Sequence, residues 1–396
     1  MHASYPRCRS LLTGLITLEF AALALAQTNR PARISDQPGI PFKLATFEAD
    51  GKVQIGLVLG SRVVDIARAN AYVTREAKLP AVQIPTAMRE LIEQYEKVNR
   101  RLYQIANYFQ AKPPSRPPFV FSAVEVSFEA PIKYPWNILA IAANYRAHAE
   151  GVAAQRTASE AAPGRKGAGA AQGGAAASGF NASVLSQIDP DRDAPVFFAK
   201  SPRSCIIDPG DSYYIPPGRE RIDWEGELAI VIGKPTRFVS KEQSHDYVFG
   251  YSIMYDLSDR GGGAPRRTVS MFSGTNWFEG KSIDRGAPFG PVIVPKEFIA
   301  DAGNLRLVTR VNGEVMQSDR TESMIWKERH MISYLSSILT LYPGDVISTG
   351  TPAGTGMERQ KFLKPGDVVS IEIEKIGTLT TNIRAWSDQP SGGLAR

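Results

Sequence analysis

Two carboxylates separated by a single residue give the strongest chemical signal in this 396-residue sequence. Glu225 and Glu227 lead into the apolar run 228–232, which predicts a strand, and residues two apart on a strand point to the same face. Like charges this close raise each other's pKa unless a cation neutralises them. Mg²⁺, Mn²⁺ or Ca²⁺ would suit these oxygens, although an isolated pair of this kind is more often a solvated strand face.

A third acid and two cations follow this pair. Asp256 ends the apolar run 251–255, Arg260 comes soon after it, and Lys281 lies in a turn-rich stretch. Three acids and two cations fit a metal site with handles for an anionic substrate, and Asp223 is a further candidate on the same face. Spacing alone leaves a solvated surface equally open.

Histidine is scarce, with four in the chain. His245 falls in a charged turn and His330 on the polar side of a predicted helix, so both are expected at the surface. His148 is therefore the candidate for proton transfer.

Composition and missing motifs exclude several classes of protein. The 34 Gly and 28 Pro favour a strand-rich, turn-rich fold over a helical bundle. The net charge of +6 is spread along the chain without a basic stripe, which suits small acidic substrates and excludes nucleic acid as a partner. Phosphate-binding, dinucleotide-binding and zinc-protease motifs are absent from the sequence.

The predicted elements divide the chain. A hairpin is expected over 42–59 around Asp50-Gly51, and a helix over 86–109. After residue 133 the pattern changes to short strands at 137–143, 227–233, 248–255, 305–311, 346–349 and 368–373, with one helix at 322–341. Within 151–180, seven Gly and eleven Ala predict a flexible insertion.

The first 26 residues have the composition of a secretory signal. Arg7 and Arg9 precede the mostly apolar run 11–25, and Ala24-Leu25-Ala26 resembles a cleavage site. These features predict export, to a bacterial periplasm, and no membrane attachment once the signal is removed.

Several segments together resemble the fumarylacetoacetate hydrolase family, in consistent order from about residue 135 to 384. The matching segments are Asn144-Tyr145-Arg146-Ala147-His148, Phe197-Phe198-Ala199-Lys200, 223–233, Tyr255-Asp256-Leu257-Ser258-Asp259-Arg260, Gly280-Lys281-Ser282, Asn312-Gly313-Glu314, 343–354, Lys364-Pro365-Gly366-Asp367 and Ile376-Gly377-Thr378-Leu379.

The resemblance implies an α+β, strand-rich fold: a mixed β-sandwich roll at 133–396, preceded by a small N-terminal α+β domain at 27–132. It implies a flexible lid insertion at 151–193 and a homodimer. The metal ligands would be Glu225, Glu227 and Asp256, holding Mg²⁺ or Mn²⁺, with Ca²⁺ possible.

The resemblance also implies the roles of the remaining site residues. His148 would activate water, and Lys281 would stabilise an enolate. Hydrolytic members pair this histidine with a glutamate three residues later, but Gly151 stands there, so the nearest acid is Glu150. The residues expected to contact substrate are Arg260, Thr351, Tyr145 and Lys200.

The activity implied is metal-dependent hydrolysis of C–C bonds in acylpyruvate-like or fumarylacetoacetate-like 2-oxo and 1,3-diketo acids. Two alternatives stay open. The same site could serve an isomerase, decarboxylase or hydratase of 2-oxo diacids in the breakdown of aromatic compounds. An exported protein could also bind a 2-oxo acid without turning it over.

Overall fold

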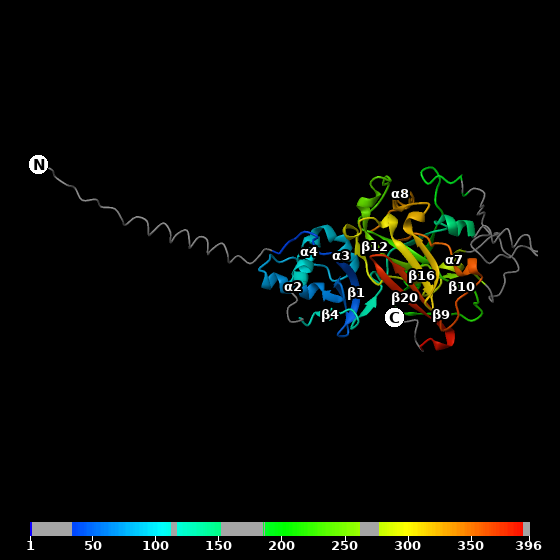
Figure 1. Cartoon of the computed structure of the whole chain (residues 1–396), viewed down its shortest axis with the longest axis horizontal. Coiled ribbons are helices and arrows are strands. Elements are labelled where there is room, and N and C mark those ends of the chain that lie inside the picture. Colours follow the sequence, from blue (N-terminus) through cyan, green and yellow to red (C-terminus); the bar gives the residue numbers. More distant parts are fainter. Residues whose placement is uncertain (2–33, 112–116, 152–184, 186, 262–276, 391–396) are drawn as a thin grey trace, which may run out of the picture.

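The computed structural model describes Met1 and residues 34–111, 117–151, 185, 187–261 and 277–390. The predicted signal at 1–26 and most of the predicted lid insertion at 151–193 lie outside the described residues. The rest forms a strand-rich α+β structure, as predicted (Figure 1).

The N-terminal part is a five-stranded sheet in the order β4-β3-β2-β1-β5, with helices α2 and α4 packed against β2. Its first two strands are the predicted hairpin, and Asp50 and Gly51 both take the positive φ that a tight hairpin turn requires. The predicted helix 86–109 is two helices, α3 and α4, separated at Gln94. The elements are β1 (Lys43–Ala49), β2 (Lys52–Leu59), β3 (Arg62–Asp65), α2 (Ile66–Glu76), α3 (Met88–Glu93), α4 (Tyr95–Ala111), β4 (Val120–Ser122) and β5 (Ser127–Glu129).

The remainder contains two larger sheets. One has the order β15-β12-β11-β18-β6-β7, and the other the order β17-β16-β19-β20-β9. Their strands are β6 (Ile138–Ile141), β7 (Phe197–Lys200), β9 (Ser212–Ile215), β11 (Gly226–Ile232), β12 (Val248–Tyr255), β15 (Val294–Pro295), β16 (Arg306–Val311), β17 (Glu314–Arg320), β18 (Val346–Ser348), β19 (Val368–Ile373) and β20 (Gly377–Ala385). Each predicted strand is present, with bounds that differ by a few residues at most.

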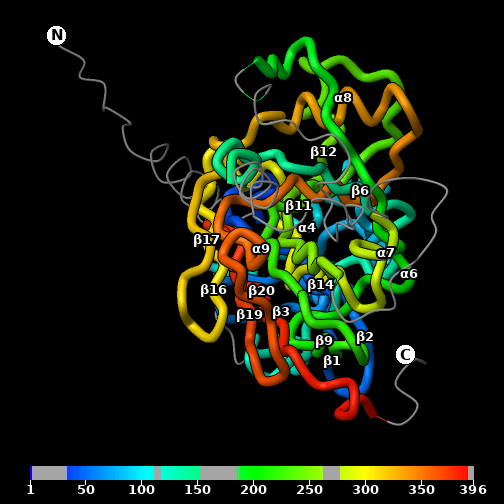
Figure 2. Tube along the Cα trace, turned by 90° about the vertical axis from the view of Figure 1, so that its right-hand side faces the viewer, coloured from blue at the N-terminus to red at the C-terminus, as the bar shows by residue number. Residues whose placement is uncertain are grey.

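The two larger sheets pack face to face through β11, β16 and β19 (Figure 2). At Gly226 they approach so closely that a Cβ atom would lie 2.3 Å from Oγ1 of Thr309. Only glycine fits there. A buried hydrophobic cluster joins residues of the N-terminal sheet, such as Leu44, to Val231 and Met254 of the six-stranded sheet. The domain boundary near residue 132 stays a prediction, and the core crosses it.

Short elements complete this part: α6 (Pro202–Cys205), β8 (Ile206–Ile207), β10 (Ile222–Asp223), β13 (Ser258–Asp259), α7 (Trp277–Lys281), β14 (Ala287–Pro288), α8 (Glu328–Ile338) and α9 (Gly356–Arg359). The helix predicted at 322–341 is therefore shorter than expected. Before α8, residues 321–323 form a separate 3-10 turn and Met324 forms a bridge with Tyr145, and the backbone N–H of Ile325 donates to the carbonyl of Asn144 at 2.7 Å. This contact ties the start of α8 to the chain just before the helical segment 146–151, which carries His148.

Candidate active site

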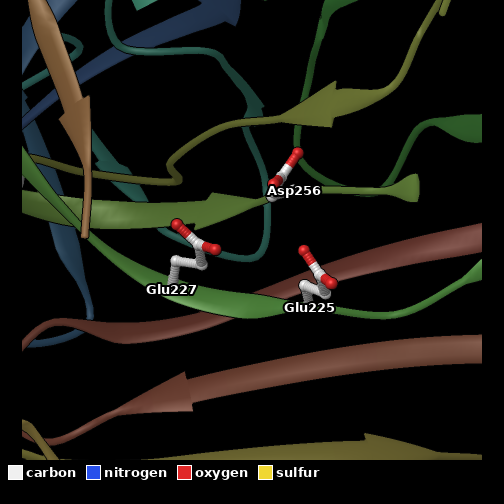
Figure 3. Close-up of side chains that lie close together, drawn as sticks. All are labelled: Glu225, Glu227 and Asp256. Carbon is white, nitrogen blue, oxygen red and sulfur yellow. The ribbon is translucent and has the colours of Figure 1, made fainter. Parts of the chain in front are cut away.

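Glu225, Glu227 and Asp256 come together on one hairpin, as the sequence predicted. Glu225 immediately precedes β11, Glu227 lies on it, and Asp256 follows the paired strand β12. Figure 3 shows the two glutamates on the same side of their strand with Asp256 above them. All three are at most 4% exposed, and one oxygen from each lies within 4.8 Å of the others.

Cations surround Glu225 and Asp256. The Lys281 ammonium lies 2.5 Å from Oε2 of Glu225 and 2.5 Å from Oδ2 of Asp256. Lys200 contacts the other oxygen of Asp256 at 2.5 Å, and Arg260 donates to Oε1 of Glu225. Burial acts to raise the pKa of Glu225, but Arg260 and Lys281 outweigh it, so this pKa is lowered.

Among the described residues, Glu227 has only neutral hydrogen-bond partners. A single oxygen, Oε2, accepts hydrogen bonds from the Ser348 hydroxyl at 2.5 Å and from the Gly350 N–H at 2.9 Å. Burial, followed by the charges of Asp256 and Glu225, raises the pKa of Glu227 to about 8. A buried all-oxygen cluster with one carboxylate lacking a counter-charge fits a hard divalent cation.

His148 is paired with an acid that the sequence reasoning missed. Its Nδ1 contacts Oε1 of Glu358 on α9, and both side chains are largely buried. The other oxygen of Glu358 accepts from the N–H of Gly354 and, at 3.3 Å, from that of Thr355. A Cβ atom on Gly151 would lie 3.2 Å from this carboxyl group. Glu358 thus fills the space next to the position where a glutamate was expected.

The capping-box pattern Thr355-x-x-Glu358 was the available signal for this residue, but it indicates only a helix start. Glu150, the acid predicted to assist His148, is exposed instead. It lies in an open cleft of about 490 Å³ together with Asp319.

Asp223 does not join the metal cluster. Its carboxylate accepts from the backbone N–H groups of Gly356 at 2.5 Å and Met357 at 3.1 Å, and from Nε of Arg260 at 2.9 Å. Asp223 therefore connects α9, the helix that carries Glu358, to Arg260, which also contacts Glu225.

Tyr145 is fully buried, and among the described residues its hydroxyl has no hydrogen-bond partner. Burial and the charges of Asp319 and Glu227 raise its pKa well above the usual range, so the phenol stays protonated. The preceding residue, Asn144, fixes the backbone just before the helical segment 146–151. It donates from Nδ2 to the carbonyls of Thr349 at 2.8 Å and Trp326 at 3.0 Å.

Three residues expected to contact substrate form hydrogen bonds within the protein, and their contact with substrate stays a prediction. Lys200 contacts Asp256, Arg260 contacts Asp223 and Glu225, and the Thr351 hydroxyl donates to the carbonyl of Gly226 at 3.0 Å. They hold the ligand-bearing strands in place.

The two other histidines that the structure describes lie outside this cluster. His245 is exposed and its Nδ1 lies 2.9 Å from Glu328, whereas His330, expected at the surface, is buried. His330 accepts from the backbone N–H of Lys327 and its Nε2 lies 3.2 Å from Asp191.

Comparison with known proteins places the chain among related sequences. The family model described as fumarylacetoacetate (FAA) hydrolase C-terminal matches residues 137–384. A mitochondrial oxaloacetate tautomerase of Xenopus laevis is 31% identical over 376 residues, which cover 93% of this chain and 98% of that relative. An oxaloacetate tautomerase of Bacillus subtilis is 33% identical over 350 residues, covering 86% of this chain and 100% of the relative.

Other matches are shorter or structural. A mitochondrial oxaloacetate tautomerase of rat is 40% identical over 191 residues, but the match spans only 58% of that protein's length and 48% of this chain. The crystal structure of a Sphingobium maleylpyruvate hydrolase in complex with manganese(II) ion and pyruvate has a TM-score of 0.58 and 25% identity, covering 87% of this chain and 99% of that one.

These relatives overturn the prediction of export to a periplasm. The Xenopus and rat relatives are named as mitochondrial proteins, so the compartment inferred from residues 1–26 is wrong. Basic, acid-poor N-terminal segments occur in several kinds of targeting sequence, so composition did not select the secretory kind. Within the described residues, none of the helices is both long and apolar enough to span a bilayer. The homodimer stays a prediction.

Proposed function

We propose that this chain, which belongs to the fumarylacetoacetate hydrolase family, is a divalent-metal-dependent enzyme that interconverts the keto and enol forms of a small 2-oxo diacid. The observation that carries the proposal is the buried His148–Glu358 pair beside the carboxylate cluster. The tautomerase names of the two relatives that align over most of this chain support the reaction class.

His148 is arranged to act as a base. With Nδ1 facing the Glu358 carboxylate, its proton stays on Nδ1, and Nε2 has a lone pair to accept a proton. His148 lies close enough to Glu225 to contribute, in its protonated form, to the lowered pKa of that carboxyl group, so the imidazole lies near the metal-binding carboxylates. We assign Nε2 to removing, and returning, the proton on the carbon next to the keto group.

Glu225, Glu227 and Asp256 would hold Mg²⁺, Mn²⁺ or Ca²⁺, which when bound polarises the 2-oxo oxygen. Lys281, between Glu225 and Asp256, supplies positive charge for the enolate or for a substrate carboxylate. Tyr145 contributes a hydroxyl that has no partner among the described residues, and such a group costs about 1–3 kcal/mol when buried unpaired. A substrate oxygen would relieve that cost.

Hydrolysis of a C–C bond is the second candidate function. It needs the same base to activate water, and one structural relative is named as a maleylpyruvate hydrolase. Decarboxylation would use the same stabilised enolate but no base.

A substrate panel separates these reactions. The enol form of oxaloacetate and an acylpyruvate are incubated with the protein and Mn²⁺, and products are followed by ultraviolet absorbance and mass spectrometry. We expect faster loss of the enol absorbance with no change in mass. Two product acids would indicate a hydrolase, and pyruvate with carbon dioxide a decarboxylase. Binding without turnover, or turnover that persists in chelator, would contradict the proposal.

The base is tested separately by Glu358→Gln. This variant keeps the shape of the side chain but removes the charge that orients His148, so we expect kcat to fall about 100-fold, within the range of lost acid–base catalysis. Mn²⁺ affinity measured by calorimetry should not change. Glu150→Gln, the same substitution at the exposed acid, should cost far less activity. Equal losses in the two variants would contradict the assignment of Glu358.

A further inference from the structure

Gln317 on β17 has a buried side-chain amide that lies against Gly226, the first residue of β11. Its side chain is 1% exposed. Oε1 accepts the N–H of Gly226 at 3.1 Å, while Nε2 donates to the Thr351 hydroxyl at 2.8 Å and to the Pro352 carbonyl at 2.7 Å. Since the Thr351 hydroxyl donates to the carbonyl of Gly226, the three residues form a closed ring of hydrogen bonds.

This ring of hydrogen bonds takes the place of the strand pairing that β18 would provide if it continued as far as Gly226. β18 pairs with β11 from Val346 to Ser348, with Ser348 opposite Ala229. Continued by three residues, the same register would place Thr351 opposite Gly226. The chain turns away first, because Gly350 has a φ of +86° and Pro352 follows Thr351. Both backbone polar groups of Gly226 would then be buried without partners, and the side chains of Gln317 and Thr351 satisfy them instead.

Gly226 is the residue between the two glutamates of the cluster. Any rotation of its peptide groups would swing Glu225 and Glu227 relative to each other. Thr309 on β16 and Ile371 on β19 lie so close to Gly226 that no Cβ atom fits there. One side of this peptide is therefore packed against the second sheet, and the ring of hydrogen bonds holds the side that faces away from β12.

We propose that Gln317 is a positioning residue for the metal centre: by completing the sheet at Gly226, it sets the separation of Glu225 and Glu227 and holds the Thr351 turn against them. The inference rests on the metal dependence of the proposed function, but not on which reaction is catalysed. Groups that orient metal ligands in this way typically contribute about 10- to 100-fold to metal affinity.

The test is Mn²⁺ affinity by calorimetry, without any assay of turnover. Gln317→Leu should weaken Mn²⁺ binding at least about tenfold. Ser336→Ala is the matched control, because it also removes a buried side-chain hydrogen bond, to Val239 N–H, but on α8 away from the cluster. It should bind Mn²⁺ like the wild type. Binding by Gln317→Leu within twofold of wild type would overturn the proposal.

Thr351 supplies a second route if Gln317→Leu does not fold. Thr351→Val opens the ring and should weaken Mn²⁺ binding, whereas Thr351→Ser keeps the hydroxyl and should restore it. Equal affinities in these two variants would overturn the proposal. Wild-type protein that binds no Mn²⁺ would contradict the metal centre itself, and so the proposed function, whereas wild-type binding with unaffected variants would contradict only the role of Gln317.

Discussion

Glu225 and Glu227 leave the same face of one strand, yet their surroundings differ in charge. Glu225 is contacted by Arg260 and Lys281, which lower its pKa. Within the described part of the chain, Glu227 accepts hydrogen bonds only from Ser348 and Gly350, and its pKa is raised to about 8. Among the described residues, one end of the cluster is neutralised by the protein itself, whereas the other has no charged hydrogen-bond partner.

The two ionised glutamates therefore contribute with opposite signs to the free energy of unfolding of the metal-free protein. Without a metal, ionised Glu225 is stabilised by its neighbours, whereas ionised Glu227 is repelled by Asp256 and Glu225. A bound divalent cation would benefit Glu227 most.

The largest expected effect comes from removing either glutamate. Glu225→Ala and Glu227→Ala should each weaken Mn²⁺ binding by more than about 100-fold, because each removes a ligand oxygen and not merely a group that orients one. Calorimetry measures this, and Glu372→Ala, which removes an exposed acid on β19, is the control. The difference between the two ends should appear in urea titration of the metal-free proteins, where Glu225→Ala loses stability and Glu227→Ala does not. Equal destabilisation would contradict the comparison.

A smaller effect is expected from removing one partner at each end. Arg260→Met leaves Glu225 and Asp223 as buried charges with a lost counter-ion, so the free energy of unfolding should fall by about 3–5 kcal/mol. Ser348→Ala removes a neutral partner of Glu227 and should cost about 1 kcal/mol. Urea denaturation of both metal-free variants checks the order, which would be reversed if Glu227 were the better compensated acid.

A third effect depends on pH. The pKa of Glu227 rises from its ordinary value of 4.5 to about 8 on folding, so the stability linked to its proton is complete below pH 4.5 and is lost as pH rises through 8. Glu227→Gln cannot lose that proton. We expect its melting temperature in chelator to exceed that of the wild type at pH 8.5, by about 2–4 °C for each kcal/mol, and to match it at pH 5.

Scanning fluorimetry at both pH values measures this difference. Glu372→Gln is the control for a general change in charge. An advantage of Glu227→Gln that is the same at pH 5 and pH 8.5 would show that the charge of Glu227 is not its cause.

The cluster of three acids was predictable from sequence only in part. Strand periodicity placed Glu225 and Glu227 on one face, whereas the resemblance to the family added Asp256. Glu225 immediately precedes β11, Glu227 lies on it, and Asp256 follows the paired strand β12. The same periodicity correctly located β12 and β19.

Features that depend on distant segments were not predictable. Glu358 pairs with His148 across 210 positions of sequence, and no periodic pattern links the two. The backbone N–H of Ile325 bonds to the carbonyl of Asn144 just before α8, and His330 contacts Asp191 from a distant part of the chain. Lys200, Arg260 and Thr351 were correctly placed near the cluster, but sequence could not show which of their polar atoms are already used.

The long separation of His148 and Glu358 has a consequence for synthesis on the ribosome. A growing chain contains all three acids of the cluster by residue 256, but Ser348, Gly350 and Glu358 emerge much later. A nascent or truncated chain that ends between residues 282 and 347 would contain the three proposed metal ligands and Lys281, yet lack Glu358, the partner of His148. Competence for the proposed chemistry would therefore be acquired only when nearly the whole polypeptide has been made.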